Sequence, residues 1–145
     1  MAYSIDILPA LKARADGLYE VAEKWSVAAD VGGGRRVTVQ IGEGFATDGA
    51  SIPRALWRLC GHPFETPRAV AALAHDWLYA SHATDRKTAD MVFRSLCVLV
   101  GVGKARAAVE YSALRLFGWA AWRSHGAEEN AAARVLGCVR VEGAE

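Results

Sequence analysis

The chain has 145 residues, of which 17 are Lys or Arg and 16 are Asp or Glu, so the formal net charge is +1. This balance argues against a protein that binds nucleic acid mainly by neutralising phosphates, and we expect no sequence-specific nucleic-acid partner. With 52% hydrophobic and 23% charged residues, the composition also excludes a disordered chain, and we expect one domain over residues 1–145.

Membrane and secretory signals are absent from the sequence. No stretch approaches the roughly 20 apolar residues of a membrane-spanning helix, and the first residues lack the pattern of a signal peptide. The cysteines, Cys60, Cys97 and Cys138, lie far apart without a Cys-x-x-Cys pair, which favours thiols in a reducing compartment over disulfides or zinc. We therefore expect a cytoplasmic protein without a transmembrane segment.

The first third of the chain predicts β-structure. Residues 1–16 support no firm assignment, but alternating apolar residues predict a strand from Leu18 to Val27. Three consecutive glycines within Asp30–Gly34 predict a turn, and Arg36–Ile41 alternates again as the partner strand of a hairpin. Gly42–Pro53 is predicted to be a loop.

The remainder predicts helices. After a short apolar segment around Leu56 and Trp57, Thr66-Pro67 is a helix start signal, and that helix should reach about Ala80. Further helices are expected from Thr84 or Asp85 to about Val100, from about Lys104 to Arg123, and over residues 127–136, followed by a strand or an irregular tail. The predicted fold class is α+β: a small antiparallel β-hairpin or sheet beside a mainly helical bundle with an antiparallel helical hairpin.

His75 and Asp90 are candidate partners across that helical hairpin. If the turn is centred between His82 and Ala83, both residues lie at the same height on helices about 8–10 Å apart. A histidine oriented by a carboxylate is suited to act as a general base. Tyr79 shares the face of His75 at i, i+4, whereas Asp76 points about 100° away.

Asp76 is therefore a candidate ligand for a hard cation, with the loop around Asp48 and Gly49 completing the shell. The alternative is structural, because a His–Asp pair also serves as a buried polar link between helices. The spacing alone leaves both interpretations open.

The sequence resembles domain-of-unknown-function family 1353, a family of phage and bacterial proteins. The resemblance covers about residues 18–118 and leaves 127–145 as a C-terminal extension. It implies a phage or prophage origin but no established activity. The residues that carry it are Gly44-Phe45, Thr47-Asp48-Gly49-Ala50-Ser51-Ile52-Pro53-Arg54, Trp57, Ala72–Tyr79, Arg86, Ala89-Asp90, Phe93, Tyr111, Arg115 and Phe117-Gly118.

A local segment, His75-Asp76-x-x-Tyr79 with Asp90, is also similar to the catalytic helix pair of phospholipase A2 enzymes. This resemblance implies that His75 activates water, Asp90 orients His75, Tyr79 supports the network, and Asp76 binds calcium with the loop at Asp48 and Gly49. The chain departs from that pattern at Ala72, where those enzymes usually have a cysteine, and in lacking paired cysteines and a signal peptide.

The expected function is thus a phage-derived, calcium-dependent, phospholipase-like hydrolase of a lipid or ester substrate. The alternative is a non-enzymatic virion, tail-associated, assembly or host-interaction protein whose partners are other phage proteins, located in the host cytoplasm or in the particle. Two other patterns are weaker. His62 lacks the helical setting that an HD phosphohydrolase requires, and Ser51 lacks the Gly-x-Ser-x-Gly setting of a nucleophile elbow.

Overall fold

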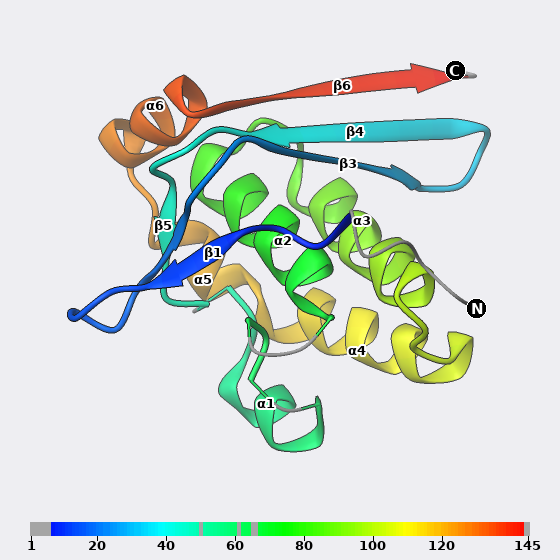
Figure 1. The fold of residues 1–145 in the computed structure, drawn as a ribbon. Helices are drawn as coiled ribbons and strands as arrows, with labels where there is room; N and C mark the ends of the chain where they lie inside the picture. Colours follow the sequence, from blue (N-terminus) through cyan, green and yellow to red (C-terminus); the bar gives the residue numbers. More distant parts are fainter. Residues whose placement is uncertain (1–6, 50, 61, 65–66, 144–145) are drawn as a thin grey trace.

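The larger β-structure is a three-stranded antiparallel sheet of order β3-β4-β6. A computed structural model describes residues 7–49, 51–60, 62–64 and 67–143 of the chain. The strands of this sheet are β3 (Trp25–Asp30), β4 (Arg35–Ile41) and β6 (Gly137–Gly143). Alternate residues of β3 and β4 face the core, and Val37, Val39 and Ile41 are fully buried. Figure 1 shows this sheet lying across one side of the helices.

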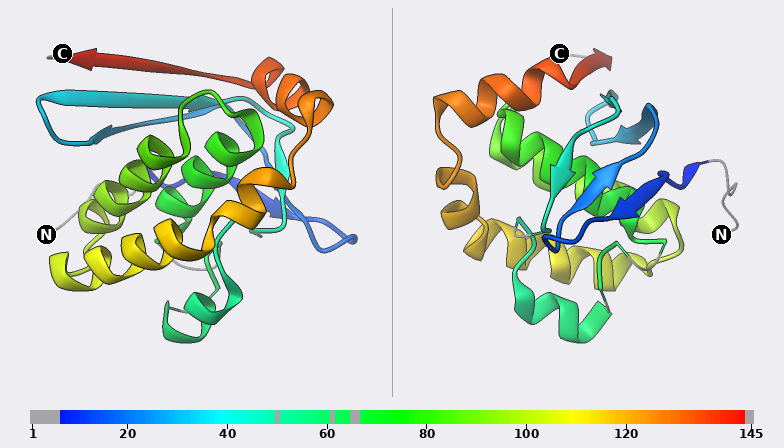
Figure 2. Two further views of the ribbon diagram at one scale, coloured as in Figure 1. Left: turned by 180° about the vertical axis from the view of Figure 1, so that it is seen from behind. Right: turned by 60° about the vertical axis from the view of Figure 1, so that its left-hand side comes forward.

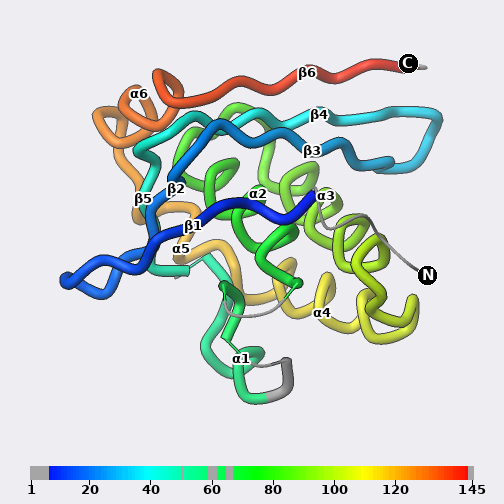
Figure 3. The backbone as a smooth tube through the Cα atoms, viewed as in Figure 1, coloured from blue at the N-terminus to red at the C-terminus, as the bar shows by residue number. Residues whose placement is uncertain are grey.

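A second antiparallel sheet of order β1-β2-β5 lies beside the start of the first. It consists of β1 (Leu11–Ala13), β2 (Tyr19–Val21) and β5 (Ala46–Thr47). The backbone tube in Figure 3 shows how the chain runs from β2 directly into β3 and returns from β4 into β5. The short strand β5 therefore ends where the segment at Asp48 begins, so the sheet positions that segment.

The helices are α1 (Arg54–Cys60), α2 (Ala69–Ser81), α3 (Arg86–Leu99), α4 (Lys104–Phe117), α5 (Trp119–Arg123) and α6 (Ala127–Val135). With the two sheets they make an α+β fold, as the sequence predicted. Every residue of α2 is buried, because α3, α5, α6 and β4 pack around it. Its alanines leave room for these neighbours, and a helix that is apolar on all sides requires such a position. The two views in Figure 2 show α2 enclosed in this way.

The C-terminal segment is built into the same core. The Trp77 indole donates to the Ala133 carbonyl at 2.9 Å, and the Arg134 guanidinium donates to the Ser81 carbonyl at the end of α2 at 2.8 Å. Strand β6 then pairs with β4 along its whole length. Residues 127–143 thus cover α2 and complete the sheet, and the predicted hairpin of two strands is a sheet of three.

The predicted strand Leu18–Val27 is wrong, because this stretch forms β2 and β3 in two different sheets. Ala22, Glu23 and Lys24 between them are all exposed, which breaks the alternation. The backbone bends there because β2 pairs with β1 and β5, whereas β3 pairs with β4. Periodicity identifies extended chain but carries no information about pairing partners.

The predicted helix Lys104–Arg123 is interrupted at Gly118, where α4 ends and α5 begins. The Arg86 guanidinium donates to the carbonyls of Leu114 at 3.0 Å and Arg115 at 3.2 Å. A cation at the last carbonyls of a helix is favoured by the helix dipole. Here the Arg86 guanidinium binds carbonyls of the last turn of α4, beside the point where a further helical turn would continue. Gly118 also lies against Tyr79, since a Cβ at this position would be 2.5 Å from the phenol oxygen.

Several smaller expectations can also be compared with the structure. The predicted hairpin turn at Gly32–Gly34, the helix after Asp85 and the helix within 127–136 are confirmed. Helix α2 begins at Ala69, after the predicted start at Thr66-Pro67, and Thr66 lies outside the described residues. The predicted loop Gly42–Pro53 contains β5, and the uninterpreted N-terminal stretch contains β1. In the described part of the chain, no helix has the length and apolar character needed to cross a membrane.

We predict that Gly118→Ala lowers the free energy of unfolding by about 1–3 kcal/mol, because the new methyl group would overlap the Tyr79 hydroxyl and the Leu114 carbonyl. Urea titration of both proteins would measure the change. Gly103→Ala is the matched control, because no atom lies within 4 Å of the added Cβ at that position. Equal losses in the two variants would show that the contact at Gly118 is unimportant.

Candidate functional site

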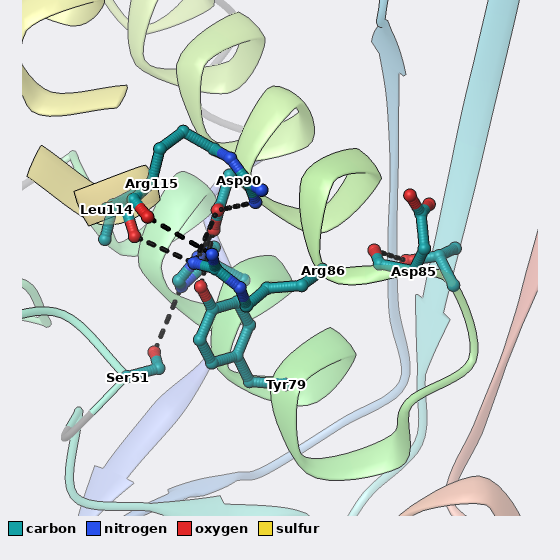
Figure 4. A network of polar contacts seen from close by, with 9 residues as sticks. Ser51, Tyr79, Asp85, Arg86, Asp90, Leu114 and Arg115 are labelled. Atoms are coloured by element: carbon teal, nitrogen blue, oxygen red, sulfur yellow. Dashed lines mark hydrogen bonds and ion pairs between the residues drawn. The ribbon is translucent and has the colours of Figure 1, made fainter. Parts of the chain in front are cut away.

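Asp90 on α3 is the centre of a buried polar network. Its carboxylate is 0% exposed and receives hydrogen bonds from side chains of three helices. The donors are His75 Nε2 at 2.8 Å, Tyr79 Oη at 2.7 Å, Arg115 Nη1 at 2.8 Å and Arg86 Nη1 at 3.4 Å. Figure 4 shows Arg86, Arg115 and Tyr79 converging on Asp90. A buried charge with this many donors is compensated at every lone pair it presents.

His75 connects Asp90 to a third residue, Ser51. Ser51 Oγ lies 3.1 Å from His75 Nδ1, and Ser51 approaches from the segment before α1 in Figure 4. An ionised Asp90 only accepts hydrogen bonds, so His75 Nε2 must carry a proton. In a neutral ring Nδ1 is then the acceptor, and the Ser51 hydroxyl donates to it. The three residues form one directional chain from Ser51 through His75 to Asp90.

Burial and hydrogen bonding set the charge states of this chain. Burial lowers the pKa of His75 below its ordinary value even though Asp90 opposes the shift, so the ring is neutral at neutral pH. Burial alone would raise the pKa of Asp90, but hydrogen bonds from His75, Tyr79 and Arg115 outweigh it and hold this pKa below its usual range. Burial and the nearby carboxylate of Asp90 raise the pKa of Tyr79, which therefore keeps its proton.

Asp76 follows His75 in α2 and points to a different side of the helix, toward Thr47 of β5. Its Oδ2 accepts a hydrogen bond from Thr47 Oγ1 at 2.8 Å, while Oδ1 is buried and has no hydrogen-bond partner among the described residues. Burial, together with the negative charge of Asp48, raises the pKa of Asp76 to about 8 despite the Thr47 hydrogen bond. This carboxyl group is thus only half satisfied.

A pocket of about 420 Å³ lies beside Ser51 and Asp76. Its polar walls include Ser51, Asp76, Asp48 and Thr47, and its apolar walls come from β5 and its surroundings and from the ends of α2 and α5. The lining residues are Leu18, Phe45, Ala46, Thr47, Asp48, Ser51, Asp76, Ala80, Ala121, Ser124 and His125. Ser51 therefore faces the pocket and contacts the buried His75, so it links the two.

The structure places His75 in contact with Asp90, and the predicted cation ligands Asp48, Gly49 and Asp76 do not all have the same position relative to the pocket. The contact between His75 and Asp90 and the presence of Tyr79 beside them are confirmed. Asp76 and Asp48 both line the pocket. Gly49 is buried with φ +79°, and its carbonyl accepts a hydrogen bond from the Ile52 N–H at 3.1 Å, so this glycine shapes the turn that presents Ser51.

Sequence reasoning missed Ser51 and Arg115 as members of the site. Ser51 lacks a nucleophile-elbow sequence, yet the turn at Gly49 and Pro53 brings it to His75 by another route. Arg115 belongs to a helix far along the chain, and the 2.8 Å bond to Asp90 depends on how α4 packs on α3. Both residues stand within the motifs of the family resemblance, which was the available signal.

Comparison with known sequences identifies the family. The profile of the family described as "Protein of unknown function (DUF1353)" matches residues 19–114, which is more than half of the chain. The chain belongs to this family. The matched range of the DUF1353 family contains Ser51, His75, Asp76 and Asp90, and therefore the whole serine-to-aspartate chain.

One curated relative illustrates how the DUF1353 segment occurs elsewhere. "Uncharacterized protein y4iH" of Sinorhizobium fredii (strain NBRC 101917 / NGR234) is 36% identical over 72 residues, which is 50% of this chain and 30% of the relative. The similarity thus spans less than a third of that protein. No solved structure matches the chain.

We predict that Asp90→Asn lowers the free energy of unfolding by about 3–5 kcal/mol, because Arg86 and Arg115 would lose their shared buried counter-charge. Chemical denaturation at pH 7 would measure the loss. Asp30→Asn is the control, because the Asp30–Arg36 ion pair is exposed and should contribute little. A loss at Asp90 no larger than at Asp30 would contradict a central role for the network.

We predict that Asp76 makes the fold less stable as pH rises from about 4 to about 8. The pKa of Asp76 is higher in the folded protein, about 8, than its ordinary value of 3.8, so protonation favours the folded state and this contribution disappears above pH 8. The stability difference between wild type and Asp76→Asn should therefore shift in favour of the variant across this range. Both proteins retain His75 and Asp90, so their titrations cancel. A constant difference would contradict the prediction.

Proposed function

We propose that the protein is a hydrolase of ester-like substrates in which Ser51 is the nucleophile, His75 the general base and Asp90 the group that orients His75. The observation that carries the proposal is the position of Ser51. Its hydroxyl lies 3.1 Å from His75 Nδ1, and the residue lines a pocket of about 420 Å³. A nucleophile, its base and an orienting carboxylate within hydrogen-bond distance are the requirement for this chemistry.

In the first step, Ser51 Oγ attacks the carbonyl carbon of the ester while its proton passes to His75 Nδ1. The carbonyl π electrons move to oxygen, and a tetrahedral intermediate forms. Its collapse breaks the bond to the leaving alkoxide, which takes the proton from Nδ1 and departs as an alcohol. A water molecule then attacks the acyl-serine with His75 again as the base, which releases the acid and restores Ser51.

Asp90 orients the ring by accepting a hydrogen bond from the Nε2–H group and stabilises the transient imidazolium. Arg86, Arg115 and Tyr79 keep Asp90 ionised and fixed, because all three donate to it. In the phospholipase-like expectation, His75 activates a water molecule. In the structure Ser51 Oγ is at His75 Nδ1, and for this reason the proposal gives the first attack to the serine.

The calcium expectation is not needed for these steps and remains a prediction. Calcium requires six to eight oxygen ligands. Asp76 contributes an oxygen without a hydrogen-bond partner, and Asp48 lies near it at the same pocket. Over the described ranges, however, no group of three or more His, Cys, Asp or Glu side chains is placed to hold a metal ion. A phage origin, a lipid substrate and a cytoplasmic or virion location likewise remain predictions.

A second candidate is a non-enzymatic role in a phage particle or in its assembly, with the network as a structural link. It is favoured by the pairing of every polar atom of His75 and Asp90 and by the complete burial of both residues. The two candidates differ at Ser51, which a structural link uses only as a hydrogen-bond donor.

We predict that a fluorophosphonate probe labels Ser51, and that Ser51→Ala abolishes the labelling and lowers the rate of p-nitrophenyl butyrate hydrolysis by about 10³-fold or more. Mass spectrometry of the labelled peptide and a spectrophotometric assay are the measurements. Ser112→Ala, which removes an exposed hydroxyl of α4, is the matched control.

The assay also separates the alternatives. Full activity in Ser51→Ala, together with loss of activity in a folded His75→Gln variant, would show that the nucleophile is a water molecule activated by His75 and not Ser51. Absence of both labelling and hydrolysis in the wild type would favour the structural role.

A further inference from the structure

Asp76 is a polar residue of the pocket wall that has a hydrogen-bond partner at only one of its two carboxylate oxygens. The side chain is 3% exposed, lines the pocket, and presents Oδ1 without a hydrogen-bond partner in the part of the chain that the structure describes. Buried carboxylate oxygens are almost always paired, because an unpaired one has lost its hydration without replacement. An unpaired oxygen at a pocket wall therefore indicates that a ligand supplies the donor.

The surroundings of Asp76 indicate what kind of donor this is. Asp48 lies at the same pocket, and its negative charge adds a smaller contribution to the effect of burial in raising the pKa of the Asp76 carboxyl group. Among the described residues that line this pocket there is no Lys or Arg. His125, which also lines the pocket, is hydrogen-bonded to the exposed carboxylate of Glu129 at 2.9 Å. The acidic groups of the described wall, Asp48 and Asp76, therefore favour a cationic ligand over an anionic one.

We propose that this pocket binds the positively charged nitrogen of an organic ligand, a primary ammonium or a guanidinium group, through Asp76 Oδ1 with Asp48 contributing charge. A cation there would donate a charge-assisted hydrogen bond to the oxygen that lacks a partner, and its positive charge would favour the ionised form of Asp76 beside Asp48. The apolar walls at Leu18, Phe45 and Ala121 fit the carbon skeleton of such a ligand.

This inference rests on the proposed function for its meaning, since it names the substrate class of the same site. Ser51 and Asp76 line one pocket, so a substrate held by its cationic end at Asp76 would have its carbonyl group within the space that Ser51 faces. The preferred substrates would be esters or amides that carry an amino or guanidino group, rather than neutral lipids.

The test uses a matched pair of ligands, N-acetyl-lysine methyl ester and N-acetyl-norleucine methyl ester, which differ in the presence of the ammonium group. Calorimetric titration into Ser51→Ala measures binding without hydrolysis. We expect the lysine ester to bind about tenfold or more tightly than the norleucine ester, and the preference to disappear when Asp76→Asn is added. Glu142→Gln, which removes an exposed carboxylate of β6, is the control for net charge.

Each outcome has a separate meaning. Equal binding of the two esters, or a preference that survives Asp76→Asn, overturns the inference. Titration with calcium chloride is the second arm, and calcium binding that depends on Asp76 and displaces the lysine ester overturns the organic cation in favour of the metal. Selective binding without hydrolysis by the wild type supports the pocket inference and refutes the proposed function. Hydrolysis by the wild type without a preference for the lysine ester supports the proposed function and refutes the pocket inference.

Discussion

The burial of the Asp90 carboxylate is the constraint on which the rest of the structure depends. A charge removed from water is tolerated only when fixed donors replace the solvent, and here these donors come from α2, α3 and α4. The donors can reach one carboxylate only if the three helices pack in a single arrangement. The glycine at position 118 follows from the same requirement, because it lets the end of α4 approach Tyr79 and Arg86.

Two neighbouring residues of α2 show how one helix serves two environments. His75 faces the network, where both ring nitrogens are paired, whereas Asp76 faces the pocket with one oxygen unpaired. Rotation of about 100° per residue along the helix separates them. Because α2 is buried on all sides, neither side chain can turn toward solvent to avoid its surroundings. The contrast between a satisfied and an unsatisfied group is what distinguishes a structural contact from a candidate ligand contact.

Ser51 gives the network its functional interest. Without it, His75 and Asp90 would be a buried link between helices, with no contact to a residue that lines the pocket. The turn at Gly49 and the proline at position 53 place the serine between the pocket and the imidazole. The DUF1353 profile includes this turn together with α2 and α3, so the arrangement lies within the segment that defines the family.

The sequence by itself determined the periodic elements and the pairing of His75 with Asp90. Helical spacing and a short turn fix which residues face each other across a hairpin, since both are local properties of the chain. Tertiary structure decided the split of the first predicted strand between two sheets and the break of the predicted helix Lys104–Arg123 at Gly118. It also decided that Arg115 and Ser51 belong to the network of His75 and Asp90. These features depend on contacts between segments distant in sequence, and neither hydrophobic periodicity nor motif spacing records which distant segments will meet.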